Sequence, residues 1–261
     1  MIPPLILYHC LFLFYIIMGE ITIPNNVTHV TGIASGNGIR SGGMIQGIAP
    51  CSRIISLKIL DSLGQGNSSH ALSAMRWILD YSRRFNIKIV NLSIGTSDRR
   101  INLPLQEGVE RLWKNGILVV AAAANSNGKR NFAPPPPISP KIITVGSWED
   151  RQFYPSSRGF SFFTKESSNL PTLWASGDNI VSTLSPDYNF SLPNRKRERI
   201  IGEHYIPMSG TSMATPYVSG TAALLFEKYP RASCDEIKER LLSLSNGNHG
   251  FLSPAICHAQ R

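Results

Sequence analysis

The chain has 261 residues, of which 42% are hydrophobic and 16% are charged, and its formal net charge is +9 at pH 7. This composition excludes an intrinsically disordered chain, and the length fits one large α/β domain. The basic residues lie in small groups, such as Arg83-Arg84 and Arg195-Lys196-Arg197, and no predicted helix carries a basic stripe with interleaved aromatic residues. We therefore expect a solvated positive surface and no nucleic-acid partner.

Residues 1–18 form an apolar leader that is interrupted only by His9, and no Lys or Arg occurs before Arg40. A secretory signal peptide has a basic start, which this leader lacks. The run is also short for a membrane-spanning helix, and prolines interrupt its beginning. Three interpretations stay open: a cleaved leader, a membrane anchor that contacts the bilayer through residues 2–18, and a misassembled gene start.

The four cysteines are Cys10, Cys51, Cys234 and Cys257. No pair has the short spacing of a zinc or redox motif, so we expect isolated thiols and no metal site built from them. A disulfide between any two of them does not follow from the sequence.

Strand and helix patterns alternate along the chain. Short apolar runs predict buried strands over residues 54–60, 87–94, 117–123 and 141–146. Helical periodicity and capping residues predict helices from Ser68 or Ser69 to about 85, over 105–115 with Gly116 as its stop, over 211–229, and from Ser233, where Glu236 completes a capping box. Residues 151–200 predict loops and short strands. The alternation predicts a three-layer α/β fold, a parallel β-sheet with helices on both faces.

The segment Ser209–Gly220, SGTSMATPYVSG, predicts a nucleophile. Ser212 lies between small residues directly before an apolar run, at the start of the predicted helix 211–229. Backbone N–H groups at a helix N-terminus are unpaired and can stabilise the oxyanion that forms when a serine attacks a carbonyl. Because ligands bind outside the carboxyl ends of parallel strands, Gly95 and the Ala124-Asn125-Ser126 segment predict one cleft together with this serine.

These motifs resemble the subtilisin-like serine peptidases, the subtilase family. SGTSMATPYVSG is similar to the family's nucleophile segment, Ala121–Gly128 (AAAANSNG) to its oxyanion segment, and Thr28–Ala34 to the second half of its histidine segment. The resemblance runs from about Thr28 to Ser245, which implies an apolar leader over 1–27, a peptidase-like domain over 28–245 that is truncated at its N-terminus, and a tail over 246–261. It implies a serine-type endopeptidase that acts on polypeptides.

The resemblance assigns roles residue by residue. Ser212 matches the nucleophile, and Asn125 matches the side-chain donor of the oxyanion hole. The walls that hold the substrate backbone and its first side chain are matched by Leu92, Ser93, Ile94, Gly95, Ala122, Ala123 and Ala124, the last standing where a glycine is usual. Such an edge can pair with an extended peptide.

The catalytic base and acid are not found. The family's base position is occupied by Asn26, and His29 matches the second, non-catalytic histidine, which we expect to pack or hydrogen-bond beside the cleft. Residues 1–25 contain no Asp, and Glu20 is their only acid. The abrupt loss of resemblance favours a truncated or frame-disrupted gene over a real exchange of the N-terminus. Without its base the serine keeps its proton, so we expect severely impaired or no activity.

Two alternatives to a peptidase stay open, a chain without catalytic activity and an esterase. A catalytically inactive scaffold would bind extended peptides, or the chain would be a gene fragment that does not fold. An α/β-hydrolase esterase would use Asp235 with His249 or His258, but the Gly-x-Ser-x-Gly elbow that it needs is absent around Ser212.

The family resemblance bears also on calcium and localisation. Calcium often stabilises the family, and no ligand for it is assigned in this chain; no other cofactor is expected. The resemblance implies an extracellular or membrane-associated protein.

Overall fold

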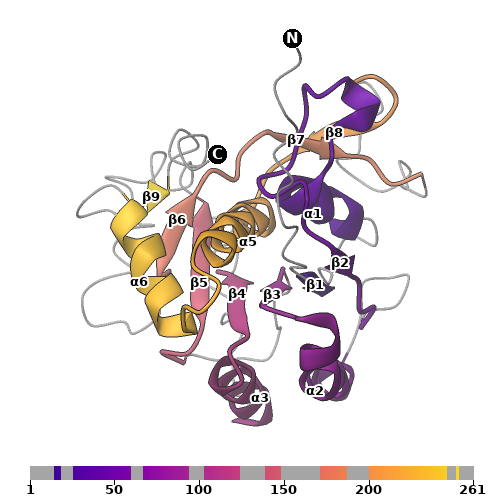
Figure 1. Cartoon of the computed structure of the whole chain (residues 1–261). Helices are drawn as coiled ribbons and strands as arrows, with labels where there is room; N and C mark the ends of the chain where they lie inside the picture. The colour runs from indigo at the N-terminus through magenta and orange to yellow at the C-terminus, as the bar shows by residue number, and fades with distance from the viewer. Residues whose placement is uncertain are drawn as a thin grey trace, which may run out of the picture.

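A parallel sheet of seven strands forms the middle layer of the structure (Figure 1). This computed structural model describes residues 15–18, 26–59, 67–93, 103–123, 139–147, 171–186, 200–245 and 251–252. The strand order is β2-β1-β3-β4-β5-β6-β9. Its strands are β1 (Tyr15–Met18), β2 (Ile54–Ile55), β3 (Ile89–Leu92), β4 (Leu118–Ala122), β5 (Ile143–Ser147), β6 (Leu173–Ala175) and β9 (Phe251–Leu252).

Helices cover both faces of the sheet, which confirms the predicted three-layer α/β architecture. In β4, Leu118 and Val120 point into a core shared with α1 (Asn26–Ser35), α5 (Thr211–Lys228) and α6 (Cys234–Leu244). Val119 and Ala121 alternate with them and join a second core, formed with α2 (Ser68–Phe85) and α3 (Leu103–Lys114). Because successive side chains of a strand point to opposite faces, a strand that is buried on both faces reads as a continuous apolar run.

Strand β1 comes from the apolar leader and lies inside the sheet, between β2 and β3. Its first residue, Tyr15, is opposite Ile54, and its last residue, Met18, is opposite Leu92. The sheet therefore crosses the sequence boundary at residue 27 where the family resemblance begins. None of the helices in the described part of the chain is long and apolar enough to cross a membrane.

Most predicted element boundaries shift by one to three residues. The predicted strand over 54–60 is reduced to Ile54–Ile55. Helix α2 is capped by Asn67, whose side chain accepts the His70 N–H, so the prediction of Ser68 or Ser69 as the cap was wrong by one or two positions. The capping box of Ser233 with Glu236 is confirmed, as is Gly116, which ends α3 with φ 76°.

A two-stranded antiparallel hairpin, β7 (Ile180–Thr183) with β8 (Tyr205–Met208), stands beside the main sheet. The chain leaves β8 and enters α5 after Ser209 and Gly210. A short 3-10 helix, η1 (Ile39–Ser41), follows α1. The hairpin thus carries the chain directly to the predicted nucleophile segment.

Two leucines of α3 test how stability depends on this packing. Leu112 is 0% exposed and Leu103 is 62% exposed. We expect Leu112→Ala to lower the free energy of unfolding by about 2–5 kcal/mol, because it leaves a cavity in the core. The same change at Leu103 should stay within about 0.5 kcal/mol. Urea unfolding followed by circular dichroism measures both, and equal losses for the two variants would contradict the packing.

Candidate active site

Ser212, the predicted nucleophile, lies in the first turn of α5 and is 3% exposed. The turn before it requires glycine, because Gly210 has φ 144°, which side chains rarely tolerate. The Gly210 N–H donates to the Gly177 carbonyl at 2.7 Å, and the Met213 N–H donates to the Gly210 carbonyl at 2.9 Å. The serine therefore stands at a desolvated helix N-terminus, where N–H groups can stabilise developing negative charge.

Polar contacts fix the turn that leads to this serine. Ser209 Oγ donates to Asp178 Oδ1 and accepts the Asn179 N–H at 2.9 Å. These two bonds join the end of the β7–β8 hairpin to the residues directly before β7. The nucleophile segment is therefore held at both strands of the hairpin.

The end of β3 touches the start of α5. Ser93 follows β3 directly, and its Oγ donates to the Ser212 carbonyl at 3.3 Å across 119 residues of sequence. Leu92, the last residue of β3, is buried and lies opposite Ala121 of β4, so the carboxyl ends of the two strands are side by side. The structure therefore brings together the predicted nucleophile and two of the predicted substrate-wall residues.

The second predicted wall begins at the end of β4. Ala122 is the last residue of the strand, and the Ala123 N–H donates to the Val145 carbonyl of β5 at 2.8 Å. This bond anchors the chain just before the predicted oxyanion segment. The remaining predicted site residues, Ile94, Gly95, Ala124 and Asn125, lie outside the described residues, and their roles stay predictions.

Two buried polar side chains that the sequence analysis did not single out, Asn91 and Ser219, connect β3 with α5 together with Ser93. Ser219 Oγ donates to Asn91 Oδ1 at 2.9 Å, with the Thr215 carbonyl as a second acceptor at 3.2 Å. Asn91 Nδ2 donates to Ser93 Oγ, also at 2.9 Å. The signal was a polar residue, Asn91, in the middle of an apolar strand, where a buried amide must find partners.

Helix α1 begins at Asn26, the residue at the family's base position. The side chain of Asn26 lies outside the described part of the chain, so its role stays a prediction. The helix itself is fixed to the hairpin, because Thr183 Oγ1 donates to the Thr28 carbonyl at 2.6 Å and Ser182 Oγ donates to the His29 carbonyl at 2.8 Å. The hairpin therefore sets α1 and α5 relative to each other.

His29 has the packing and hydrogen-bonding role that was expected. It is 0% exposed, and its Nε2 lies 2.9 Å from the Ile206 carbonyl, to which it donates. Burial lowers the pKa of His29 to about 4, against the smaller opposing effect of backbone hydrogen bonds. With Nε2–H held by a carbonyl, the basic nitrogen of the neutral ring is Nδ1, which is buried and has no hydrogen-bond partner among the described residues, so His29 does not act on the Ser212 hydroxyl in this arrangement.

The other described histidines, and Asp235 as the acid of the alternative esterase, lie in different settings. His70 is exposed in the first turn of α2, and His204 Nε2 accepts from Arg40 Nη1 at 3.0 Å. Asp235 forms an ion pair with Lys141 at 2.9 Å, and the hydrogen bond from Lys141 lowers the pKa of this carboxyl. The two C-terminal histidines lie outside the described residues.

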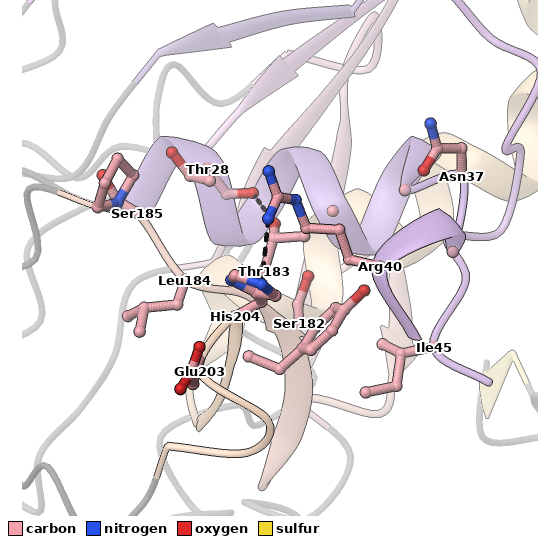
Figure 2. Close-up of a pocket in the computed structure, with 15 residues that line it drawn as sticks. Thr28, Asn37, Arg40, Ile45, Ser182, Thr183, Leu184, Ser185, Glu203 and His204 are labelled. Carbon is pink, nitrogen blue, oxygen red and sulfur yellow. Dashed lines mark hydrogen bonds between the residues drawn. The ribbon is translucent and has the colours of Figure 1, made fainter. Parts of the chain in front are cut away.

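A cavity of about 560 Å³ lies between α1, the segment after it and the β7–β8 hairpin (Figure 2). In the close-up, Arg40 reaches from the segment after α1 to His204 on the hairpin. The residues lining this cavity do not include Ser212 or the described wall residues of β3 and β4. The cavity is therefore separate from the described part of the predicted substrate cleft.

A family model described as the Subtilase family matches residues 27–254 of the chain. The chain belongs to the subtilase family.

Individual relatives support this family assignment. Serine protease AprX of Bacillus subtilis (strain 168) is 34% identical over 230 residues, which are 82% of this chain and 51% of that protein. The subtilisin of Bacillus pumilus is 32% identical over 219 residues, 83% of this chain and 68% of the relative. This subtilase chain thus spans about half the length of the first of these relatives. Among solved structures, the S41 psychrophilic protease has a TM-score of 0.65 at 21% identity. The match covers 91% of this chain and 84% of the protease. Sphericase has a TM-score of 0.66 at 20% identity, with 90% and 84% of the two chains covered.

Calcium was allowed by the family resemblance. It takes six to eight oxygen ligands, usually with several carboxylates. Within the described ranges, no group of three or more His, Cys, Asp or Glu side chains could hold a metal ion.

The buried imidazole predicts how stability depends on pH. His29 has a folded-state pKa of about 4, whereas an unfolded histidine titrates near 6.5. The unfolded chain therefore takes up the proton first, so stability falls as the pH drops from 6.5 to 4, by about 3 kcal/mol from this group. We expect His29→Gln to flatten this part of the curve in urea unfolding at several pH values.

The matched control is His70→Gln, which removes an exposed histidine. It should leave the slope between pH 6.5 and 4 unchanged. A wild-type slope that survives in the His29→Gln variant would show that other groups cause it.

Proposed function

We propose that this subtilase chain is a serine-type endopeptidase that hydrolyses peptide bonds through Ser212, and that its turnover is severely reduced in the 261-residue sequence. The observation that supports this most is the contact of Ser93 with the Ser212 carbonyl, because it places the start of α5 against the strand end that would hold the substrate. The substrate class is polypeptide, bound in extended form.

The chemistry follows from the parts present. An extended peptide would pair with the backbone that follows Leu92, beyond the last residues of β3 that pair with β1 and β4. The Ser212 Oγ would attack the carbonyl carbon and lose its proton to water. The C–N bond would then break as the leaving nitrogen takes up a proton from water, and a second water would hydrolyse the acyl ester to a carboxylic acid and restore the serine. Helix N–H groups and Asn125 would stabilise the oxyanion.

The limitation lies in proton transfer. Asn26 at the base position has no basic nitrogen to take the serine proton, and residues 1–25 contain no Asp to orient a base. In subtilisin, loss of the histidine lowers kcat about a millionfold, whereas loss of the aspartate alone costs only about 3 × 10⁴. We therefore infer that slow, oxyanion-assisted hydrolysis is what remains.

The test is to supply the base. We expect Asn26→His to raise the rate of peptide ester hydrolysis by about 10–100-fold, the ratio of the two losses in subtilisin. Asn26→Gln is the matched control and should give no gain. Ser212→Ala in the Asn26→His background should abolish the gain. A wild-type kcat of about 1–10 s⁻¹, ordinary for enzymes, would contradict the reduced turnover.

A non-catalytic role is the second candidate, because a peptide-binding edge does not depend on the base. Fluorescence anisotropy of a labelled apolar peptide measures it. Binding by a cooperatively unfolding wild-type chain, with no rate gain in Asn26→His, would favour a peptide-binding scaffold over the enzyme. Failure to unfold cooperatively would instead favour the gene fragment.

The setting of the protein is part of the same proposal. The chain resembles subtilases, so we infer an extracellular location, with calcium as a stabilising ion whose ligands are not assigned. These two inferences rest on the family alone.

A further inference from the structure

Helix α5 has a proline four residues after its nucleophile. In an α-helix the N–H of residue i donates to the carbonyl of residue i−4, so the carbonyl of Ser212 would pair with the N–H of Pro216. Proline has no N–H. The Ser212 carbonyl is therefore left without its helical donor inside a buried helix, where an unpaired carbonyl is destabilising.

Ser93 supplies the missing donor. Its Oγ lies 3.3 Å from the Ser212 carbonyl oxygen, and Ser93 as a whole is 1% exposed. A carbonyl can only accept, so the single proton of the Ser93 hydroxyl must point to it. The hydrogen bond from β3 to α5 therefore replaces the one that Pro216 removes from the helix.

The direction of this bond fixes the direction of the others. Since Ser93 donates to Ser212, it must accept from the Asn91 amide nitrogen, and the Asn91 oxygen then faces Ser219 as an acceptor. Alternation along the strand sets Ile89, Asn91 and Ser93 on the same face, the one that packs on α5. Asn91 and Ser219 are both 0% exposed, so water does not compete for these bonds.

We propose that Ser219, Asn91 and Ser93 form a positioning relay, which holds the backbone of Ser212 against β3 and thereby aligns its hydroxyl with a peptide bound at the end of that strand. This inference rests on the proposed function in one respect, the peptide at the strand end. None of the three relay residues touches the reacting atoms. They act by fixing one carbonyl, and a nucleophile displaced by about 1 Å loses about 100-fold in rate.

The test compares threonine with valine at Ser93 and at Ser219. The two replacements have the same shape and differ only in the hydroxyl. The reactivity of the side chain at position 212 is measured in the Ser212→Cys background, because a thiolate at pH 9 reacts without a neighbouring base. A peptidyl chloromethyl ketone alkylates that thiol with loss of chloride, and peptide mass spectrometry separates it from exposed Cys51.

We expect the valine variants to lower the maximal alkylation rate at least about tenfold without changing the half-saturating concentration of the peptide reagent, and the threonine variants to keep both. Leu112→Ala, which destabilises the core on the far face of the sheet, should also keep both. Equal rates for valine and threonine, or an equal loss in Leu112→Ala, would overturn the relay.

Hydrogen exchange of the backbone amides at the start of α5 gives a readout that needs no peptide. The valine variants should speed exchange there about tenfold relative to the threonine variants, with α2 unchanged. If the peptide reagent does not saturate any variant, the proposed function fails and the exchange decides the relay alone. Equal exchange in the valine and threonine variants would then overturn it.

Discussion

Burial of helix α5 is the constraint on which this structure depends. The helix runs through the middle of the molecule in Figure 1, and all of its first thirteen residues are buried. A helix that is buried all round must satisfy its polar groups internally. Thr215, Ser219 and Thr221 each place a hydroxyl near the carbonyl four residues earlier. Gly220 permits close approach, because a Cβ there would lie 2.6 Å from Ile48.

Polar contacts between segments that are distant in sequence position the site. The turn before the helix is tied to the residues ahead of β7, α1 is tied to β7, and β3 is tied to the carbonyl of Ser212. The bond at the turn is exposed, the one to α1 is half-buried and the one from β3 is buried; losing one partner of the buried bond leaves the other unpaired. The serine is thus placed by three elements that are far apart in sequence.

The predictions from sequence succeeded where the pattern was long and periodic. Helices α2 and α3 and strand β4 follow from apolar spacing that is confirmed within a few residues. They failed where a local choice depends on neighbours. The cap of α2 is Asn67 because its side chain reaches the His70 N–H. The apolar run that starts at Ile54 pairs with β1 over two residues only, and β1 pairs with β3 on its other side. Four leader residues carry no periodicity that distinguishes a strand from a leader.

The sequence alone determined the chemistry offered by this chain: a serine at a helix start, an asparagine at the base position and no aspartate before it. It also determined the layered fold, because alternation of apolar runs with amphipathic helices is local information. Only the tertiary structure decided what surrounds the serine. Three long-range pairings are examples. Asn91 pairs with Ser219, Ser93 donates to the Ser212 carbonyl that Pro216 leaves without a helical donor, and residues 15–18 join the sheet. They depend on strand register and helix packing, which no stretch of the sequence specifies by itself.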